Sequence, residues 1–137
     1  MILKNVRTLL VRNLSTQLPL QTITETKIIS QNDVDEFAKI TGDHNPIHKS
    51  DYPAADRLVH GALLNGIVSG LVGTRLPGAG SIIVAQEFQF PNKCFVDQPI
   101  IVKVDLLENR KILKIAYECM QSGNVVFKGT GKLVMAK

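Results

Sequence analysis

The sequence has no tryptophan, and only 5% of its 137 residues are aromatic. Because proteins that bind nucleic-acid bases stack them on aromatic side chains, this scarcity argues against a nucleic-acid partner. The formal net charge of +4 does not argue for one either, since Lys4, Arg7 and Arg12 lie in the first dozen residues and the remainder carries only +1. The hydrophobic content is 45%, yet no run is long and apolar enough to span a bilayer.

Cysteine is scarce as well. Cys94 and Cys119 are the only cysteines, and their spacing fits neither a redox C-x-x-C motif nor a zinc-binding pattern. We therefore expect small buried or half-buried thiols, and nothing in the sequence requires an oxidising compartment. A glycine-rich loop of the kind that cradles phosphates is also missing.

Acidic residues are missing from the start of the chain, where the first one is Glu25. Residues 1–18 are basic and carry hydroxyl groups, and four apolar residues fall on one helical face: Leu3, Val6, Leu10 and Leu14. This pattern predicts a mitochondrial transit peptide and a location in the matrix. Arg7 and Arg12 interrupt the apolar core that a secretory signal needs. The alternative is a basic, disordered tail of a cytosolic protein, and with either interpretation residues 19–137 form a single domain.

The remaining chain divides into helical and strand-like segments. Residues 22–29 are rich in β-branched side chains and predict a strand. Ser30 and Asp33 approximate a capping box, so a helix should begin at Ser30 and end at Gly42. The polar segment Ser50–Leu58 forms either a mobile flap or a short helical turn. Four further segments, joined by short turns, predict antiparallel strands: Ile82–Phe90, Ile100–Leu107, Ile112–Cys119 and Val125–Met135.

A long apolar helix is predicted between the two halves, over Val59–Thr74. Apolar side chains nearly surround it, which predicts a central, buried position: Leu63, Leu64, Ile67, Val68, Leu71 and Val72. Its interior glycines, Gly66, Gly70 and Gly73, each cost about 1 kcal/mol relative to alanine. Either a closely packed sheet or a substrate channel beside the helix would explain them. One long helix against a five-stranded antiparallel sheet is an α+β two-layer domain.

The segment Gly42–His48 combines an acid and an imidazole in a stretch that Asn45 and Pro46 should keep irregular. Asp43 can bond backbone amides or act as a base, and His48 titrates near neutral pH. His60 and Gly61 then open the long helix, where free amides and the helix dipole favour a developing negative oxygen. An acid, a histidine and an oxyanion donor in one region predict a reaction site.

These residues resemble the hydratase-2 signature of MaoC-like proteins, which include R-specific enoyl-thioester hydratases and type 2 hydroxyacyl-thioester dehydratases. The matching positions are Phe37-Ala38-x-x-x-Gly42-Asp43-x-Asn45-Pro46-x-His48, His60-Gly61, Leu76-Pro77-Gly78-x-Gly80-Ser81-Ile82, Gln86 and Phe90. The resemblance implies a hot-dog fold, with an antiparallel sheet wrapped around one long central helix, and a homodimer. It also implies acyl thioesters of CoA or acyl carrier protein as substrates, and no metal or redox cofactor.

The resemblance also implies roles for individual residues. Asp43 and His48 would hold one water and share the proton transfers, although the sequence does not decide which residue handles which proton. The Gly61 amide would bond the thioester oxygen, with its missing side chain leaving room for that approach. Ser69 is a secondary site residue, or else a hydroxyl bonded back to the preceding helical turn. Asn45 shapes the loop, and His60 is expected to orient the helix start without being catalytic.

The expected reaction is reversible hydration and dehydration between trans-2-enoyl and (3R)-hydroxyacyl thioesters. With a transit peptide, it would be the 3-hydroxyacyl-carrier-protein dehydratase step of mitochondrial fatty acid synthesis. A hot-dog acyl thioesterase and a non-catalytic acyl-thioester-binding partner are the alternatives, and the presence of Asp43 and His48 argues against both. Arg57 would either meet a phosphate of the carrier arm or remain a solvated surface charge.

Overall fold

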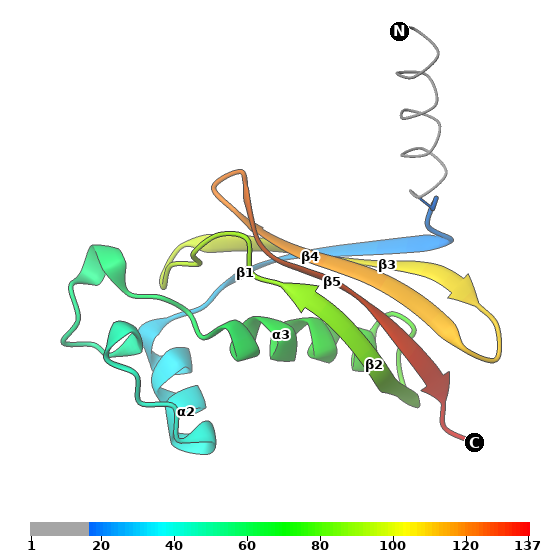
Figure 1. Cartoon of the computed structure of the whole chain (residues 1–137), viewed down its shortest axis with the longest axis horizontal. Coiled ribbons are helices and arrows are strands. Elements are labelled where there is room, and N and C mark those ends of the chain that lie inside the picture. The colour runs from blue at the N-terminus through cyan, green and yellow to red at the C-terminus, as the bar shows by residue number, and fades with distance from the viewer. Residues whose placement is uncertain (1–16) are drawn as a thin grey trace, which may run out of the picture.

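The computed structural model describes residues 17–137, and Figure 1 shows them as a curved sheet with a helix lying against it. The elements are β1 (Gln21–Ile28), α2 (Gln31–Thr41), the short 3-10 turns η1 (Pro46–His48) and η2 (Ala54–Asp56), α3 (Gly61–Thr74), β2 (Ser81–Gln89), β3 (Pro99–Asn109), β4 (Leu113–Gln121) and β5 (Asn124–Met135). Each strand lies within two residues of its predicted range, and η2 is the short helical turn predicted as one form of the Ser50–Leu58 segment.

The five strands form one antiparallel sheet in the order β1-β3-β4-β5-β2. Short hairpins join β3, β4 and β5, while β1 pairs with the outer side of β3 and β2 with the outer side of β5. The two strands that come first in the sequence therefore form the two edges of the sheet. This confirms the antiparallel five-stranded prediction.

The hydrophobic core lies between this sheet and α3. On β3, the side chains of Val102, Val104 and Leu106 are buried, whereas Lys103 lies on the opposite face and pairs with Glu118 of β4. α3 contributes four buried side chains: Leu64, Val68, Leu71 and Val72. Each such burial contributes roughly 1.5–3 kcal/mol, so this shared core fixes where α3 begins relative to the sheet.

The prediction that the long helix is central, with apolar contacts nearly all round, is not confirmed. Both predicted helices are present in residues 17–137, as α2 and α3, but α3 buries one side only. A Cβ added at Gly66, Gly70 or Gly73 would meet no heavy atom within 4 Å. A closely packed sheet therefore does not explain these glycines. Gly66 and Gly70 instead line a hollow of about 390 Å³ beside α3, so the channel explanation stays a prediction.

Both cysteines are free and buried, which confirms the expectation of buried thiols. Burial raises the pKa of Cys94 to about 11 and that of Cys119 to about 12. Both groups therefore remain protonated thiols at neutral pH, and neither has the character of a reactive thiolate.

The predicted transit peptide lies almost wholly outside the described residues. At its end, the side-chain amide of Gln17 donates to the Leu107 carbonyl over 2.9 Å, so this residue contacts the sheet. From residue 17 onward, the structure has no helix that is both long enough and apolar enough to cross a membrane.

Candidate active site

The site begins at the C-terminal end of α2. The Ser30 hydroxyl accepts from the Asp33 amide over 3.1 Å, and the Asp33 carboxylate accepts from the Ser30 amide over 2.9 Å, which confirms the capping box. At the other end Gly42 adopts φ 76°, a left-handed conformation that favours glycine, and stops the helix as predicted. The chain consequently turns sharply into the Asp43–His48 segment.

Two Asx turns shape this segment. The Asp43 carboxylate accepts from the Asn45 amide over 3.2 Å, and the Asn45 side-chain oxygen accepts from the Ile47 amide over 3.4 Å. Pro46 then begins the short turn η1, which ends at His48. Asn45 thus shapes the loop, as the sequence predicted, and places Asp43 and His48 on the same side of it.

His48 is only 8% exposed, and one hydrogen bond determines its tautomer. Its Nδ1 lies 2.6 Å from the carbonyl oxygen of Leu58. A carbonyl can only accept, so Nδ1 carries the hydrogen and the neutral ring keeps its lone pair at Nε2. This is the arrangement that a general base requires.

The strand-like segment 57–59 holds that carbonyl in place. The Leu58 amide donates to the Ile47 carbonyl over 3.0 Å, and Leu58 forms an isolated antiparallel bridge with Phe95. Arg57 is half-buried, and its guanidinium donates to the backbone carbonyls of Tyr52, over 2.7 Å, and of Ser50. The expectation of a solvated surface charge is therefore wrong, and Arg57 braces the loop that leads to Leu58.

His60 is the site residue whose position the sequence did not reveal. Its ring stacks on that of His48, with 3.7 Å between centroids and 26° between planes, and its Nε2 lies 3.2 Å from the Asp43 carbonyl. Burial lowers the pKa of His60 and the nearby His48 acts in the same direction, while the hydrogen bond to the Asp43 carbonyl and the Asp43 carboxylate oppose the change. The His60-Gly61 motif indicates that this residue belongs to the site, but no pattern in the sequence predicts the stacking.

The side chains of Asp43, His48 and His60 thus converge, with one polar atom from each lying within 4.8 Å of the others. Two imidazoles and a carboxylate can hold a divalent metal. Each histidine gives one nitrogen to a backbone carbonyl, and the remaining Nδ1 of His60 is buried with no hydrogen-bond partner in residues 17–137. Histidines that bind a metal make the same kind of carbonyl contact, so this feature does not distinguish the two uses. The free Nε2 of His48 also suits proton transfer.

Gly61 is the first residue of α3, and its amide has no acceptor within the helix. A Cβ at this position would lie 2.7 Å from the nearest ring carbon of Phe90. The sequence-based explanation for this glycine was room for a thioester; the structure shows that the space beside it is occupied by an aromatic ring. Gly61 therefore accommodates Phe90 at the start of the helix.

A hollow of about 540 Å³ opens beside the loop and α2. Asp43, Asn45 and His48 line it, and Gly61 and Ser69 do not. Ser69 is exposed on α3, and within the described part of the chain its hydroxyl has no hydrogen bond to the preceding helical turn. The structure thus brings together the predicted acid and base and leaves Ser69 apart from them.

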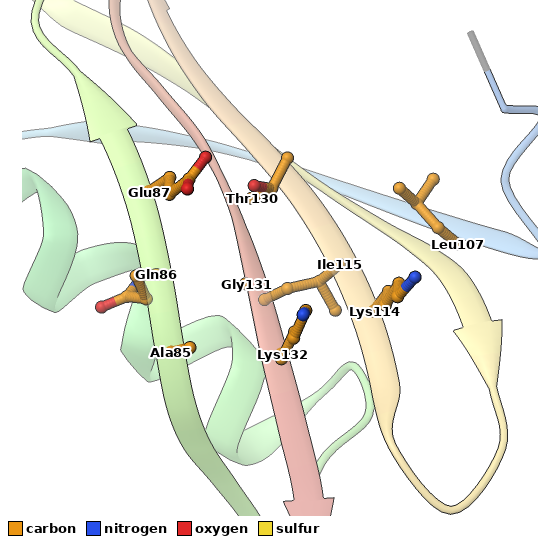
Figure 2. Close-up of a pocket in the computed structure, with 9 residues that line it drawn as sticks. All are labelled: Ala85, Gln86, Glu87, Leu107, Lys114, Ile115, Thr130, Gly131 and Lys132. Atoms are coloured by element: carbon orange, nitrogen blue, oxygen red, sulfur yellow. The ribbon is translucent and has the colours of Figure 1, made fainter. Parts of the chain in front are cut away.

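A separate hollow of about 410 Å³ lies on the face of the sheet turned away from α3 (Figure 2). Lys114 of β4 and Lys132 of β5 are direct cross-strand neighbours there, as are Glu87 of β2 and Thr130 of β5. None of the predicted site residues lines this hollow, so it lies outside the candidate active site.

The sequence was compared with family models and with curated proteins. The family model described as "MaoC like domain" matches residues 13–127. The 3-hydroxybutyryl-CoA dehydratase of Methylorubrum extorquens is 35% identical over 119 residues, covering 81% of this chain and 76% of that protein. The mitochondrial 3-hydroxyacyl-[acyl-carrier-protein] dehydratase of Arabidopsis thaliana is 26% identical over 123 residues, covering 81% and 73%.

The fold has a similar counterpart among solved structures. The (R)-hydratase from A. caviae involved in PHA biosynthesis superposes with a TM-score of 0.79 and 28% sequence identity. The match covers 88% of this chain and 98% of that one. It confirms the expected hot-dog arrangement of an antiparallel sheet packed against a helix.

Proposed function

Because this chain belongs to the family of MaoC-like domains, we propose that it is a hydro-lyase that interconverts trans-2-enoyl and (3R)-3-hydroxyacyl thioesters. The observation that carries the proposal is the hydrogen bond from His48 Nδ1 to the Leu58 carbonyl, which leaves Nε2 as the proton acceptor of a histidine that is clustered with Asp43. A buried base next to a carboxylate, at the mouth of a hollow, is what activation of a water molecule requires.

In the hydration direction, a water held between Asp43 and His48 gives a proton to His48 Nε2 as its oxygen bonds to the β-carbon of the enoyl group. The imidazolium that forms lies beside the Asp43 carboxylate, which stabilises the charge. The pair then returns a proton to the α-carbon on the same face. Both residues finish in their starting protonation states, and the net change is the addition of one water.

Negative charge gathers on the thioester oxygen during this reaction. The Gly61 amide, at the N-terminus of α3, is the donor that we assign to that oxygen, since it has no acceptor within the helix and lies where the helix dipole favours an anion. The names of the relatives, an (R)-hydratase and two hydroxyacyl-thioester dehydratases, agree with this chemistry.

The reaction is tested by adding crotonyl-CoA to the purified full chain and following the enoyl absorbance together with free thiol. We expect the absorbance to fall with no thiol released, and chiral analysis to identify the 3R product. Release of CoA would identify a thioesterase instead, and tight binding without turnover would identify a non-catalytic acyl-thioester-binding protein.

We further propose that the physiological step is dehydration of 3-hydroxyacyl carrier protein in the mitochondrial matrix. The support is the basic, acid-free segment 1–18 and the similarity to a mitochondrial plant dehydratase. A fusion of the full chain to a fluorescent protein should co-localise with mitochondria, and a cytosolic fusion would remove this part of the proposal. Comparing kcat/KM for CoA and carrier-protein thioesters tests the substrate form.

A homodimer is the assembly that we propose. β2 is an edge strand of the sheet, and it carries three exposed large apolar side chains, Ile82, Val84 and Phe88. An unpaired apolar edge of this kind is a template for pairing with a second copy. The family resemblance implies a secondary site role for Ser69, which is exposed in the single chain. A second copy would supply the neighbouring surface that this role needs.

A further inference from the structure

We propose that His60 is a positioning residue that holds the two proton-transfer groups, Asp43 and His48, at a fixed separation. The catalytic part of this inference rests on the proposed hydro-lyase function, whereas its structural part does not. The His60 side chain makes a direct contact with each of them: it bonds the Asp43 backbone carbonyl and stacks on the His48 ring.

The two contacts use different parts of the same ring. The edge of His60 points Nε2 at the Asp43 carbonyl over 3.2 Å, which fixes where the loop leaves Gly42. The face of His60 stacks on the His48 ring, with 3.7 Å between the two centroids, so it limits rotation of the base about its side-chain bonds. Phe37 of α2 packs against His60 in turn, with 4.7 Å between centroids. The ring is thus confined between α2 and the loop.

The burial of His60 distinguishes a positioning role from a catalytic one. His60 is only 2% exposed, and it is absent from the lining of the hollow that Asp43 and His48 share. It therefore has no route to substrate and acts through its neighbours. Nδ1 is buried with no partner in the described chain, so a proton there would be left without a hydrogen-bond acceptor.

A neutral His60 is what the charge balance of the site needs. The ionisable groups nearest to it are Asp43 and His48, and the hollow beside them is lined by further charged or titratable groups from α2 and the loop: Asp35, Glu36, Lys39, His44, Lys49 and Asp51. A second imidazolium stacked on His48 would oppose the protonation that the reaction requires. With His60 neutral, the Asp43 carboxylate acts on protonated His48 without that opposition.

Only histidine supplies both contacts from this position. Phenylalanine would retain a ring for stacking but cannot donate to the Asp43 carbonyl, and glutamine can donate but has no ring. His60→Phe and His60→Gln therefore remove one contact each. Val68→Ala is the matched control, since Val68 is buried on α3, the helix that follows His60, and has no part in the site.

The experiment measures kcat and KM of enoyl hydration for the full chain and these three variants, together with thermal stability. For each His60 variant we expect kcat to fall by roughly tenfold or more with KM within about threefold, as for misplaced proton-transfer groups. Val68→Ala should lose stability while its kcat and KM remain those of the wild type.

A readout independent of turnover is the NMR spectrum of the His48 ring, which should carry its hydrogen on Nδ1 in the wild type and lose this single tautomer in His60→Gln, where the stacking contact is absent. If the wild type does not hydrate thioesters but the tautomer is lost as expected, the proposed function fails and the positioning inference stands. If both His60 variants are folded and keep the wild-type kcat, and His60→Gln keeps the wild-type His48 spectrum, the inference is wrong.

Discussion

At the scale of single residues, the chemistry depends on where two histidine rings place their hydrogens. The Leu58 carbonyl fixes the hydrogen of His48 on Nδ1, and the Asp43 carbonyl fixes that of His60 on Nε2. Each backbone carbonyl thereby selects one tautomer. The result is one histidine with a lone pair available to the hollow and a second that is buried and neutral.

The lowered pKa of His60 makes the free energy of unfolding depend on pH. The unfolded chain binds a proton at this residue below about pH 6.5, whereas the folded chain resists it because the ring is buried. Stability from this group is therefore present above about pH 6.5 and is lost as the pH falls towards the pKa of the folded state, with a slope of at most about 1.4 kcal/mol per pH unit.

We predict that the wild type loses more stability than His60→Gln when the pH is lowered from about 7 to about 5.5. Urea unfolding at the two pH values measures the difference, and Val68→Ala serves as a control for a general loss of stability. An equal loss in wild type and His60→Gln would show that another group carries the pH dependence.

At the scale of elements, the start of α3 is the critical junction, because Gly61 meets Phe90 there. In Gly61→Ala, the new Cβ would lie 2.7 Å from the Phe90 ring, which is closer than a Cβ approaches other atoms, so the ring must move. We predict a double-mutant cycle between Gly61→Ala and Phe90→Ala with a coupling free energy of about 1 kcal/mol in unfolding. Additive effects would contradict the contact.

Activity in the same cycle separates two explanations of the glycine. If Gly61 serves only to accommodate Phe90, hydration lost in Gly61→Ala should be largely regained when Phe90→Ala is added. If the missing side chain also leaves room for the thioester, as the sequence suggested, the double variant should regain stability and remain impaired in kcat/KM.

The elements differ in how far the sequence predicted them, and the reasons are physical. The capping box at Ser30 and the stop at Gly42 depend on residues close in the chain, so they were predictable. The exposed glycine face of α3 was not predictable. Apolar periodicity indicates that a helix packs against something, but it does not indicate how much of the helix surface other residues of the chain cover. Local sequence patterns therefore predict local geometry only.

The candidate site shows the same division. Asp43, Asn45 and His48 lie within six residues and were predicted together, and the structure places all three in one loop. The contacts of His48 with the Leu58 carbonyl and with the His60 ring join positions that are ten and twelve residues apart. Such contacts depend on how residues 57–59 fold back against the Asp43–His48 loop. No pattern in the sequence predicts that position.

At the scale of the whole molecule, the apolar edge of β2 should decide the assembly. We predict that the protein is a homodimer and that Val84→Lys converts it to a monomer, because a charge on an edge strand opposes pairing with a second copy. Light scattering after size exclusion measures the mass. Thr26→Lys places the same charge on β1, the opposite edge, and should leave the dimer intact.

A dimer that is equally sensitive to both lysine substitutions would contradict pairing through β2. A wild-type monomer would contradict the homodimer itself and with it the surface proposed for Ser69. In that case Ser69→Ala should have no effect on kcat or KM, since the hydroxyl is exposed on α3 in the single chain.

The most direct test of the central claim is the rate of crotonyl-CoA hydration by the full chain beside Asp43→Asn and His48→Gln, with Lys111→Gln, on the exposed β3–β4 turn, as control. We predict that the wild type and the control hydrate the substrate, and that each site variant remains folded while kcat falls by about a hundredfold or more, as the loss of a general acid or base requires. A folded wild type that hydrates neither crotonyl-CoA nor an enoyl carrier protein, or site variants with undiminished kcat, would contradict the assignment of Asp43 and His48 as the proton-transfer pair.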